Sequence, residues 1–408
     1  MKNKSKENLP LNGIKVLDVS SFIAAPLSSA IMSDYGADVI KIESPTGDTF
    51  REAVIGGQVW PNSDIDWAFL LENRNKKSLC LNLKTNQGKS ILEKLVKKSD
   101  VFITNLPKGP RERLKLTSNI IRKMNPRIIY ASLSGYGEEG PQASSTALDA
   151  TAWWAHSGLM EWSKPDNNGF PPFPVPGVGD HPTGLAIFSA ILLALINRGK
   201  TGKGTNVSTS LFANGIWANA MLVQAILAGH KPIDTFHWNK LSALRNLYYL
   251  KDKSILFLML TDEKKFWLPF IKALDLESLN DNNRYNTQDN REKNKNSLKK
   301  IFENTFKKLT YNQAYKLLTP TGVVFTKVQS TQEAVKDINT KANKMFFNIK
   351  YRGHKNLKTV APPINIEDVK RVSAKRAPKL GEHTKRILLE MGYSNDEIRQ
   401  FKRIGVIS

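Results

Sequence analysis

The segment 175–184 gathers residue types that could do chemistry. It reads Val-Pro-Gly-Val-Gly-Asp-His-Pro-Thr-Gly and stands before an apolar run, 185–196, that predicts a buried helix. Glycine and proline at this density predict a tight turn with exposed backbone N–H groups. Asp180 at the mouth of a helix is either an N-cap, whose carboxylate accepts hydrogen bonds from free N–H groups, or a nucleophile presented beside small residues.

The nucleophilic interpretation gives the neighbours of Asp180 defined tasks. Backbone N–H groups at Gly179 and Gly184 would stabilise a developing oxyanion, and the absence of side chains there leaves room for an acyl group. His181 could steer a proton or bond to the carboxylate, although a histidine beside proline is more often structural. Gly179, His181 and Gly184 are therefore predicted to position the reaction.

The first third of the chain predicts the elements that would hold this turn, because short β-like runs alternate with helix-length segments. Such alternation predicts an α/β fold with a doubly wound parallel sheet and helices on both faces. The segment 185–229 has a helical pattern broken at 199–204, and 153–176 predicts an extended segment. Strands are predicted over 14–19, 37–43, 78–83, 100–105 and 127–133, and helices over 25–35, 88–98, 118–124, 382–391 and 395–403.

Two nucleotide-binding motifs are missing from the sequence. The turn after the first predicted strand, 20–26, has no Gly-x-Gly-x-x-Gly, which disfavours a nicotinamide or flavin dehydrogenase. The segment 199–201, Gly-Lys-Thr, lacks the earlier glycine of a Walker motif because position 194 is alanine. Cys80 is the single cysteine, so no intrachain disulfide or cysteine zinc cluster can form.

Composition sets the broad class of protein. A chain of 408 residues predicts two domains, and the formal net charge of +23 attracts polyanions in general. The basic residues are scattered, which is typical of a solvated surface. The N-terminal segment leads into no apolar signal core, and the apolar run 185–196 is shorter than the roughly 20 residues that span a bilayer. A cytoplasmic protein without nucleic-acid or membrane partners is expected.

Blocks of sequence in a set order carry a resemblance to a known family. They begin with Gly-Ile-Lys-Val-Leu-Asp at 13–18, Ala-Pro at 25–26, and Tyr-Gly-Ala-Asp-Val-Ile-Lys-Ile-Glu at 35–43. Asp180 stands in Gly-Val-Gly-Asp-His-Pro-Thr-Gly at 177–184. Over nearly its whole length the chain resembles the class III CoA-transferases, the formyl-CoA and carnitine-CoA transferase type. Further matching blocks are 75–78, 81–84, 125–127, 134–137, 140–141, 377–384 and 391–393.

The resemblance implies a fold and a reaction. The fold would be an interlocked, ring-like homodimer, with a large Rossmann-like domain built from 1–229 and 331–408 and a smaller α/β domain at 230–330. The family's aspartate attacks an acyl-CoA thioester to give a mixed anhydride, and the released thiolate then forms an aspartyl-CoA thioester that the acceptor acid attacks. By motif match this aspartate is Asp180. CoA thioesters would be substrates, with no tightly bound cofactor and no metal.

CoA is expected to lie on the large domain without a glycine fingerprint. Ser44 stands where several members of the family have arginine, and Leu106 stands where an aromatic residue usually follows the asparagine. Lys108, Arg111 and Arg113 lie just beyond, and a guanidinium matches a phosphate well. The predicted CoA contacts are Phe22, Asn105, Leu106, Lys108 and Arg113.

Departures from the family pattern bear on the activity. Related racemases use a histidine before an aspartate as an acid/base group, and that pair here is Leu148-Asp149, which disfavours an acyl-CoA racemase. A shielding glycine-run loop is not visible near 256–261.

Within the family, 175–181 and 75–78 look most like transferases for 2-hydroxy acids, either aryl-lactates or branched ones. The alternative from another class is a non-catalytic polyanion-binding protein. Aromatic residues that could line an acid pocket are Trp153, Trp154, Trp162, Phe170 and Phe173.

Overall fold

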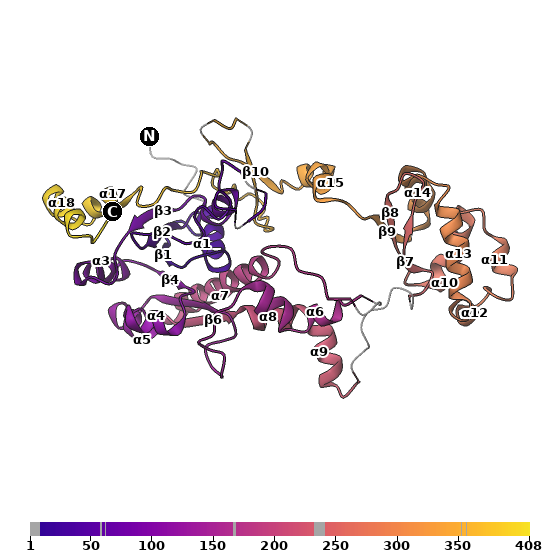
Figure 1. Ribbon diagram of the computed structural model, residues 1–408, viewed down its shortest axis with the longest axis horizontal. Coiled ribbons are helices and arrows are strands. Elements are labelled where there is room, and N and C mark those ends of the chain that lie inside the picture. The colour runs from indigo at the N-terminus through magenta and orange to yellow at the C-terminus, as the bar shows by residue number, and fades with distance from the viewer. Residues whose placement is uncertain are drawn as a thin grey trace. The chain divides into compact units, whose positions relative to one another are not determined.

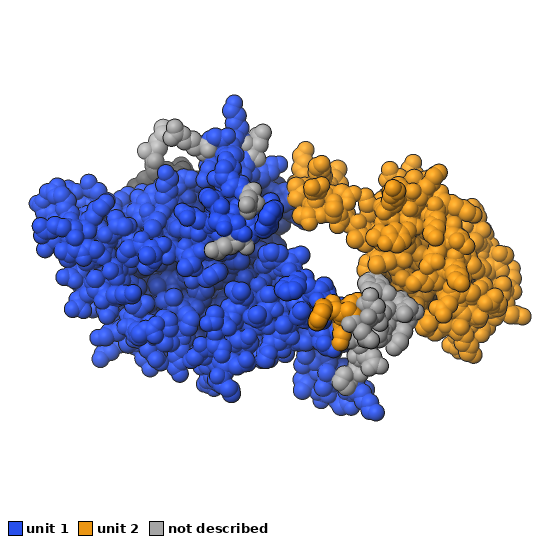
Figure 2. All heavy atoms as spheres, viewed as in Figure 1, with its two compact units in different colours: residues 1–163, 171–234, 343–408 blue, residues 164–170, 235–342 orange. Residues whose placement is uncertain are grey.

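The structure is a computed structural model that describes residues 9–57, 59–61, 63–165, 169–231, 241–351, 353–355 and 357–408. The chain divides into two compact units, which Figure 2 shows in different colours. The larger unit comprises Met1–Ser163, Pro171–Asp234 and Asn343–Ser408, and the smaller comprises Lys164–Phe170 and Thr235–Ala342. The assignment of 1–229 with 331–408 to CoA binding, and of 230–330 to a separate domain, stays a prediction.

Within the described residues, the larger unit contains a six-stranded sheet in the order β3-β2-β1-β4-β5-β6 (Figure 1). Every neighbouring pair of these strands is parallel. The order reverses between β1 and β4, as in doubly wound sheets that bind ligands at that point. The predicted parallel α/β sheet is confirmed. Its strands are β1 Lys15–Val19, β2 Asp38–Glu43, β3 Lys77–Cys80, β4 Val101–Thr104, β5 Ile129–Ser134 and β6 Asn206–Ser210.

Helices cover both faces of this sheet because successive strand residues point to opposite sides. Val16 of β1 belongs to one hydrophobic core, which includes helices α1 (Ala24–Asp34) and α7 (Asp180–Thr201). Leu17 belongs to the other core, which includes α3 (Asn86–Val96). Also on that second face lie α5 Ser118–Met124 and, from the end of the chain, α17 Thr384–Glu390 and α18 Asn395–Arg403.

Helix α7 is a long element of the larger unit, with 22 residues from Asp180 to Thr201. Among the described residues it is long and apolar enough to cross a membrane by length and composition, a test that core helices also pass. Its residues Ile187, Phe188 and Ile191 are buried against the sheet and α1. The helix ends at Gly202, whose φ of +71° favours glycine.

Two expectations from the sequence are wrong. The stretch 185–229 is not helical throughout, because β6 follows α7 and pairs with β5 at the edge of the sheet before α8 (Leu211–Ala218) and α9 (Ala220–Leu227). The stretch 153–176 is not wholly extended, because a π-helix, η2 (Asp149–Ala155), and α6 (Leu159–Trp162) occupy its first part. Tertiary packing favours η2, since its Trp153 is buried against Gly179.

The smaller unit has an antiparallel sheet in the order β7-β8-β9 and its own hydrophobic core. Its elements are β7 Arg245–Tyr249, β8 Ile255–Met259, α10 Glu263–Ala273, α11 Ser278–Asp281, α12 Gln288–Lys293, α13 Lys295–Phe306, α14 Tyr311–Leu318, η4 Thr319–Thr321, β9 Val324–Lys327, α15 Thr331–Lys336 and α16 Ile338–Ala342. The remaining elements of the larger unit are α2 Trp67–Asn73, α4 Lys108–Arg113, β10 Phe346–Asn348 and β11 Lys358–Val360.

Candidate active site

Asp180 is the first residue of α7, and its position in the molecule follows from the contact between α7 and α1. A Cβ built at Gly184 would lie 2.7 Å from the carbonyl oxygen of Ala24, so glycine lets the two helices approach closely. Helix α1 begins just after the carboxyl end of β1. Asp180 therefore lies at the carboxyl edge of the parallel sheet, where ligands bind in folds of this type.

Asp180 does not cap its helix. The N-cap is Gly179, and no side chain caps the helix there. None of the described residues donates a hydrogen bond to the Asp180 carboxylate, which remains partly accessible. The helix dipole still favours a negative charge in the first turn. The carboxylate is thus left available for chemistry.

The surroundings of Asp180 make it easy to protonate. Burial and, after it, the neighbouring carboxylates of Asp149 and Glu72 raise its pKa from 3.8 to about 7, although the charge of His181 acts in the opposite direction. Asp149 comes from η2 and Glu72 from α2, so three separate elements deliver carboxylates to one place. A carboxylate with poor solvation and repulsive neighbours is a stronger nucleophile than one in water.

His181 contacts the buried carboxylate of Glu72, with Nε2 3.1 Å from Oε1. Burial lowers the histidine pKa, but the hydrogen bond and charge of Glu72 and the charges of Asp180 and Asp149 outweigh it, so the pKa is raised above 6.5. Gly177 has φ +77°, and a Cβ there would lie 3.1 Å from His181 Cε1. The histidine ring is therefore packed between Gly177 and Glu72.

The two predicted positioning glycines have visible structural roles. The Gly179 N–H donates to Asp149 Oδ2 at 3.2 Å. A Cβ at Gly179 would lie 2.5 Å from Trp153 Cγ, and Gly184 is the contact point with α1. Both positions need glycine for packing, and their role toward an oxyanion stays a prediction.

A cavity of about 240 Å³ opens at the carboxyl ends of β1, β2 and β3. Val19, Ile42 and Leu106 give it apolar walls, and residues 20–21 of the β1–α1 loop close one side. The exposed Lys84 also lines the cavity. The same β1–α1 loop leads into α1, which touches Gly184, so the loop connects the cavity with the region of Asp180.

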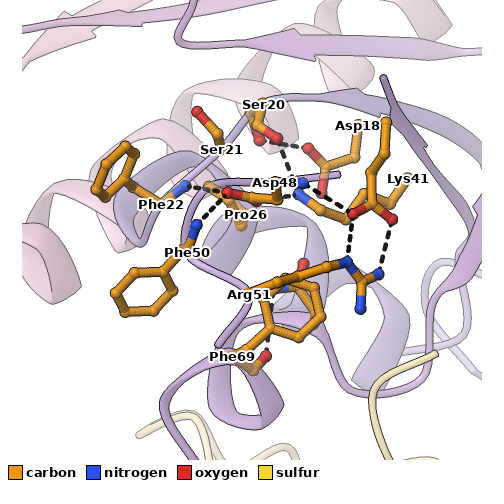
Figure 3. A network of polar contacts seen from close by, with 12 residues as sticks. Asp18, Ser20, Ser21, Phe22, Pro26, Lys41, Asp48, Phe50, Arg51 and Phe69 are labelled. Carbon is orange, nitrogen blue, oxygen red and sulfur yellow. Dashed lines mark hydrogen bonds and ion pairs between the residues drawn. The ribbon is translucent and has the colours of Figure 1, made fainter. Parts of the chain in front are cut away.

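Buried charges hold the β1–α1 loop in shape (Figure 3). Lys41 Nζ lies 2.8 Å from Asp48 Oδ2 and donates to the Ser20 carbonyl at 2.8 Å. Asp48 Oδ1 accepts the N–H of Phe22 at 3.3 Å, where φ is +65°. Burial lowers the Lys41 pKa, but the charges of Asp18 and Asp48 outweigh the effect of burial, so the Lys41 pKa is raised overall.

A second buried lysine fixes α2, the helix that carries Glu72. Lys76 Nζ donates to Asp18 Oδ2 at 2.7 Å, to the Pro26 carbonyl at 2.8 Å and to Asn73 Oδ1 at 2.9 Å. Burial lowers the pKa of Lys76 to about 8, although the charge of Asp18 raises it. The end of α2 is thereby tied to β1 and α1.

Glu43, the acid at the end of the second strand, forms hydrogen bonds with other side chains of the protein. Arg51 Nε and Nη2 donate to its two oxygens at 2.6 and 2.8 Å, and Ser78 Oγ donates at 2.7 Å. The Arg51 guanidinium also lies over the Phe69 ring, 4.2 Å from its centre (Figure 3). This contact links the loop after β2 to α2.

The predicted CoA contacts fall into two groups. Leu106 lines the cavity, and Asn105 joins two loops, because its Oδ1 accepts the Ser21 N–H at 3.0 Å and its Nδ2 donates to the Ser21 carbonyl at 2.8 Å. The Phe22 side chain is exposed, and its ring centre lies 5.9 Å from that of Phe50. These residues shape the carboxyl edge of the sheet.

The basic residues of α4 form the second group. Lys108 and Arg113 are exposed and do not line the described cavity. Arg111 is buried and pairs with Glu138 through two hydrogen bonds of 3.1 and 2.6 Å. Arg111 is therefore committed to the protein, and Lys108 and Arg113 remain the predicted phosphate contacts of this helix.

A larger hollow of about 580 Å³ lies at the opposite edge of the sheet, at the amino ends of the strands. Lys15, Asp38 and His383 are among its lining residues, and Asp180 lines neither this hollow nor the 240 Å³ cavity. Within the described ranges, no group of three or more His, Cys, Asp or Glu side chains is placed to hold a metal ion.

Three residues to which the sequence analysis gave no role at the site belong to this region: Glu72, Asp149 and Lys84. Glu72 meets His181 across 109 positions of sequence, and Asp149 meets Gly179 across 30. Lys84 ends the matching block 81–84, so its place in that block could have marked it as a residue of the site. For Glu72 there was no local signal, because an acid near the end of a short helix is common on surfaces.

Comparisons with known proteins identify the family of this chain. Residues 11–384 match the model of CoA-transferase family III. A (R)-2-hydroxy-4-methylpentanoate CoA-transferase of Clostridioides difficile is 32% identical, over 97% of this chain and 99% of that protein. A cinnamoyl-CoA:phenyllactate CoA-transferase of Clostridium sporogenes is 27% identical, over 96% of both chains.

Solved structures share the fold. The crystal structure of a CAIB/BAIF family protein from Brucella suis has a TM-score of 0.81 and 26% sequence identity, and the match covers 94% of this chain and 100% of that one. Because the family model spans nearly the whole chain and the curated relatives are named as CoA-transferases, this chain belongs to CoA-transferase family III and is an enzyme that transfers coenzyme A.

Proposed function

We propose that the enzyme moves CoA from an acyl-CoA to a free carboxylic acid through covalent intermediates on Asp180. The observation that carries this proposal is a partly buried carboxylate at the start of α7 that no described residue hydrogen-bonds and that two further carboxylates crowd. A covalent route needs an acceptor that is reactive, accessible and poorly solvated. Asp180 has these properties.

In the first half-reaction, an Asp180 oxygen attacks the thioester carbonyl and the C–S bond breaks with its electron pair on sulfur. The product is an acyl-aspartyl anhydride and CoA thiolate. The thiolate then attacks the Asp180 carbonyl of the anhydride, which releases the donor acid and leaves an aspartyl-CoA thioester. Holding the thiolate beside the anhydride makes this step effectively intramolecular.

In the second half-reaction, the acceptor carboxylate attacks the aspartyl-CoA carbonyl, and CoA thiolate leaves again. The thiolate attacks the acceptor's carbonyl carbon in the new anhydride, which gives the product acyl-CoA and restores the Asp180 carboxylate. Both half-reactions form and break the same two kinds of bond, an anhydride and a thioester. A single site can therefore serve the donor and the acceptor in turn.

CoA is proposed to bind at the carboxyl edge, in the 240 Å³ cavity. Its apolar walls suit a base or the pantetheine arm, and Lys84 at the cavity with Lys108 and Arg113 on α4 would meet the phosphates. Phe22, Asn105 and Leu106 would support that binding from the two loops. The homodimer implied by the family resemblance and the cytoplasmic location expected from the composition are part of the same proposal.

A 2-hydroxy acid is proposed as the acceptor. Two relatives that match nearly the whole chain are named for 2-hydroxy-4-methylpentanoate and phenyllactate, a branched and an aromatic 2-hydroxy acid. Stacked Trp153 and Trp154, with ring centres 6.2 Å apart, lie next to the turn that precedes Asp180 and offer an apolar wall.

The covalent intermediate is the sharpest test. The enzyme is incubated with an acyl-CoA and no acceptor, and mass spectrometry is expected to find a mass increase equal to CoA minus water. Borohydride should reduce the thioester and convert residue 180 to homoserine, which peptide mapping locates. Asp180→Asn is the matched control and should form no adduct. Turnover by Asp180→Asn at the wild-type rate, with deamidation excluded, would contradict the proposal.

The acceptor is identified by a screen of acyl-CoA and acid pairs. Product acyl-CoA esters are read by mass spectrometry, and 2-hydroxy acids with branched or aromatic side chains are expected to react fastest. A matched series lacking the hydroxyl group tests the class, because equal rates for both series would remove the 2-hydroxy acid assignment without touching the covalent mechanism.

A further inference from the structure

Glu72 is a buried acid for which the reaction described above has no task. Its side chain is 2% exposed, yet only one of its oxygens has a partner, because Oε2 accepts no hydrogen bond from the described residues. The other oxygen, Oε1, lies 3.1 Å from His181 Nε2. A buried carboxylate with so little support is costly unless a cation compensates for it. The adjacent His181 supplies such a charge, and the charge of Lys76 also interacts with Glu72.

The histidine ring has little freedom. Glu72 contacts its Nε2, and Gly177 lies against its Cε1 side, where even a Cβ atom would approach to 3.1 Å. Helix α2, which carries Glu72, is in turn fixed by Lys76 through Asn73. The His181 side chain nevertheless remains 45% exposed, so part of the ring can face a substrate.

The charged groups that face His181 come from each element packed around it. Glu72 comes from α2, Asp149 from η2, and Asp180 is its neighbour on α7. All three are carboxylates, so together they favour the imidazolium form over the neutral ring. A cation next to the nucleophile is therefore built into the site.

We propose that His181, held as an imidazolium by Glu72, is the counter-ion for the negative charge that passes between Asp180 and the CoA thiolate. In this role Glu72 is a positioning residue that acts through His181. The inference rests on the covalent mechanism proposed for Asp180, and it adds the group that stabilises the thiolate between the two bond-forming steps.

The charge balance explains why such a group is useful. When the Asp180 oxygen forms its bond to the acyl carbon, the carboxylate loses its charge and the departing sulfur gains it. When the thiolate attacks the anhydride, the charge leaves on the donor carboxylate. One negative charge is thus present beside His181 throughout, and no proton has to move. A free thiol has a pKa of about 8.5, so without a cation the thiolate is readily protonated and lost from the reaction.

The first measurement is the titration of His181 itself. The chain has six histidines, so labelling with ¹³Cε1-histidine gives few NMR signals, and His181→Gln identifies the one that disappears. Glu72→Gln keeps the shape of the side chain and removes its charge. We expect the His181 pKa to fall in Glu72→Gln and to stay unchanged in Glu93→Gln, a control at a partly exposed position on α3. An unchanged His181 titration in Glu72→Gln would overturn the proposal.

The second measurement is the pH profile of kcat. Because the imidazolium is the active form, activity should decline as pH rises through the His181 pKa, and Glu72→Gln should move this alkaline limb to lower pH. The charge of Glu72 also raises the Asp180 pKa, so the acid limb should move the same way. We expect kcat to fall by about 10-fold to 100-fold while KM for the acyl-CoA changes little. A purely structural role for Glu72 would leave both limbs in place.

A further variant protects the test against misfolding. His181→Gln keeps Glu72 and alters a half-exposed side chain, and it should lose the alkaline limb altogether, whereas His181→Lys, which restores a cation, should recover part of kcat. If wild-type enzyme forms the Asp180 adduct and Glu72→Gln forms it equally fast with an unshifted profile, the counter-ion role is wrong and the covalent mechanism stands. If wild-type enzyme forms no adduct, the covalent mechanism fails and the counter-ion role falls with it.

Discussion

At the scale of single residues, three carboxylates and one histidine share a small region at the start of α7. Asp180 is partly accessible, and Asp149 and Glu72 crowd it from other elements. Bringing like charges together raises the free energy of the folded state, which is common where a group must react. The reactivity proposed for Asp180 would thus be linked to a local loss of stability.

Replacing Asp180 by Asn is therefore expected to stabilise the fold, by roughly 1–3 kcal/mol near pH 8. The folded-state pKa is raised to about 7 from 3.8, so the ionised carboxylate destabilises the folded protein fully above pH 7. This penalty disappears as pH falls toward 4, and the gain in Asp180→Asn should disappear with it. Urea unfolding across this range measures the effect. Asp38→Asn, at an exposed ion pair with Lys77, is the control and should show no such gain.

Leu148 leads to a prediction about the α-carbon of the substrate. Removing and returning an α-proton requires two acid/base groups on opposite faces, and an aliphatic side chain supplies neither. We expect no deuterium at the α-position when a chiral 2-methylacyl-CoA or 2-hydroxyacyl-CoA is incubated with the enzyme in deuterated water. Rapid uptake that disappears in Asp180→Ala would restore the racemase interpretation.

At the scale of elements, the site depends on how closely α7 approaches α1. The close approach is possible because Gly184 has no side chain at the contact with the Ala24 carbonyl. The contact of Lys76 with Asp18 fixes the neighbouring α2. The contact of Lys41 with Asp48 fixes the β1–α1 loop. A rigid scaffold of this kind holds a nucleophile in line with its substrate.

Gly184→Ala tests this contact against a matched position on the same helix. A Cβ at Gly184 would lie 2.7 Å from a backbone oxygen, so we expect a loss of about 1–3 kcal/mol in unfolding free energy and lower activity. A Cβ at Gly199 meets nothing within 4 Å, so Gly199→Ala should gain about 0.5–1 kcal/mol. The urea midpoints of the wild type and the two variants are compared. Equal midpoints for the wild type and Gly184→Ala would show that α7 can move away from α1 without cost.

At the scale of the whole molecule, the larger unit exposes apolar side chains along α7, α8 and α9. Leu193 and Ile196 of α7 are exposed, and so are Trp217 at the end of α8, which is 79% exposed, and Met221 of α9, which is 87% exposed. Large exposed apolar side chains on neighbouring elements are typical of a surface that another protein covers. We propose that a second copy of the chain covers this surface in the proposed homodimer.

The double variant Trp217→Asp, Met221→Asp is expected to weaken the dimer. Light scattering after gel filtration should give about twice the 45.8 kDa chain mass for the wild type and a value near one chain for the variant. Ile404→Asp, at a partly exposed position just after α18, should leave the mass unchanged. A wild-type protein that is monomeric at all concentrations would remove the homodimer from the proposal.

Local patterns were sufficient for the parallel sheet and for the family. Runs such as 14–19 and 100–105 are apolar and short, and helical segments separate them, so strand type and direction followed from periodicity. The strand β6 was missed, because Asn206–Ser210 was assigned to the helical pattern that resumes after the break at 199–204, and only its pairing with β5 at the edge of the sheet makes it a strand. The helical turn η2 was missed because its support comes from Gly179, distant in sequence.

By itself, the sequence determined the family and put Asp180 forward as the candidate nucleophile, since both inferences depend on residues that are neighbours in short motifs. Only the tertiary structure decided what surrounds Asp180. Glu72 and Asp149 reach the site from elements 109 and 30 positions away, and Asn105 meets Ser21 across 84 positions. The reason is physical: the pKa and orientation of a side chain depend on the solvent, charges and packing around it in space, and no local pattern records which distant elements supply them.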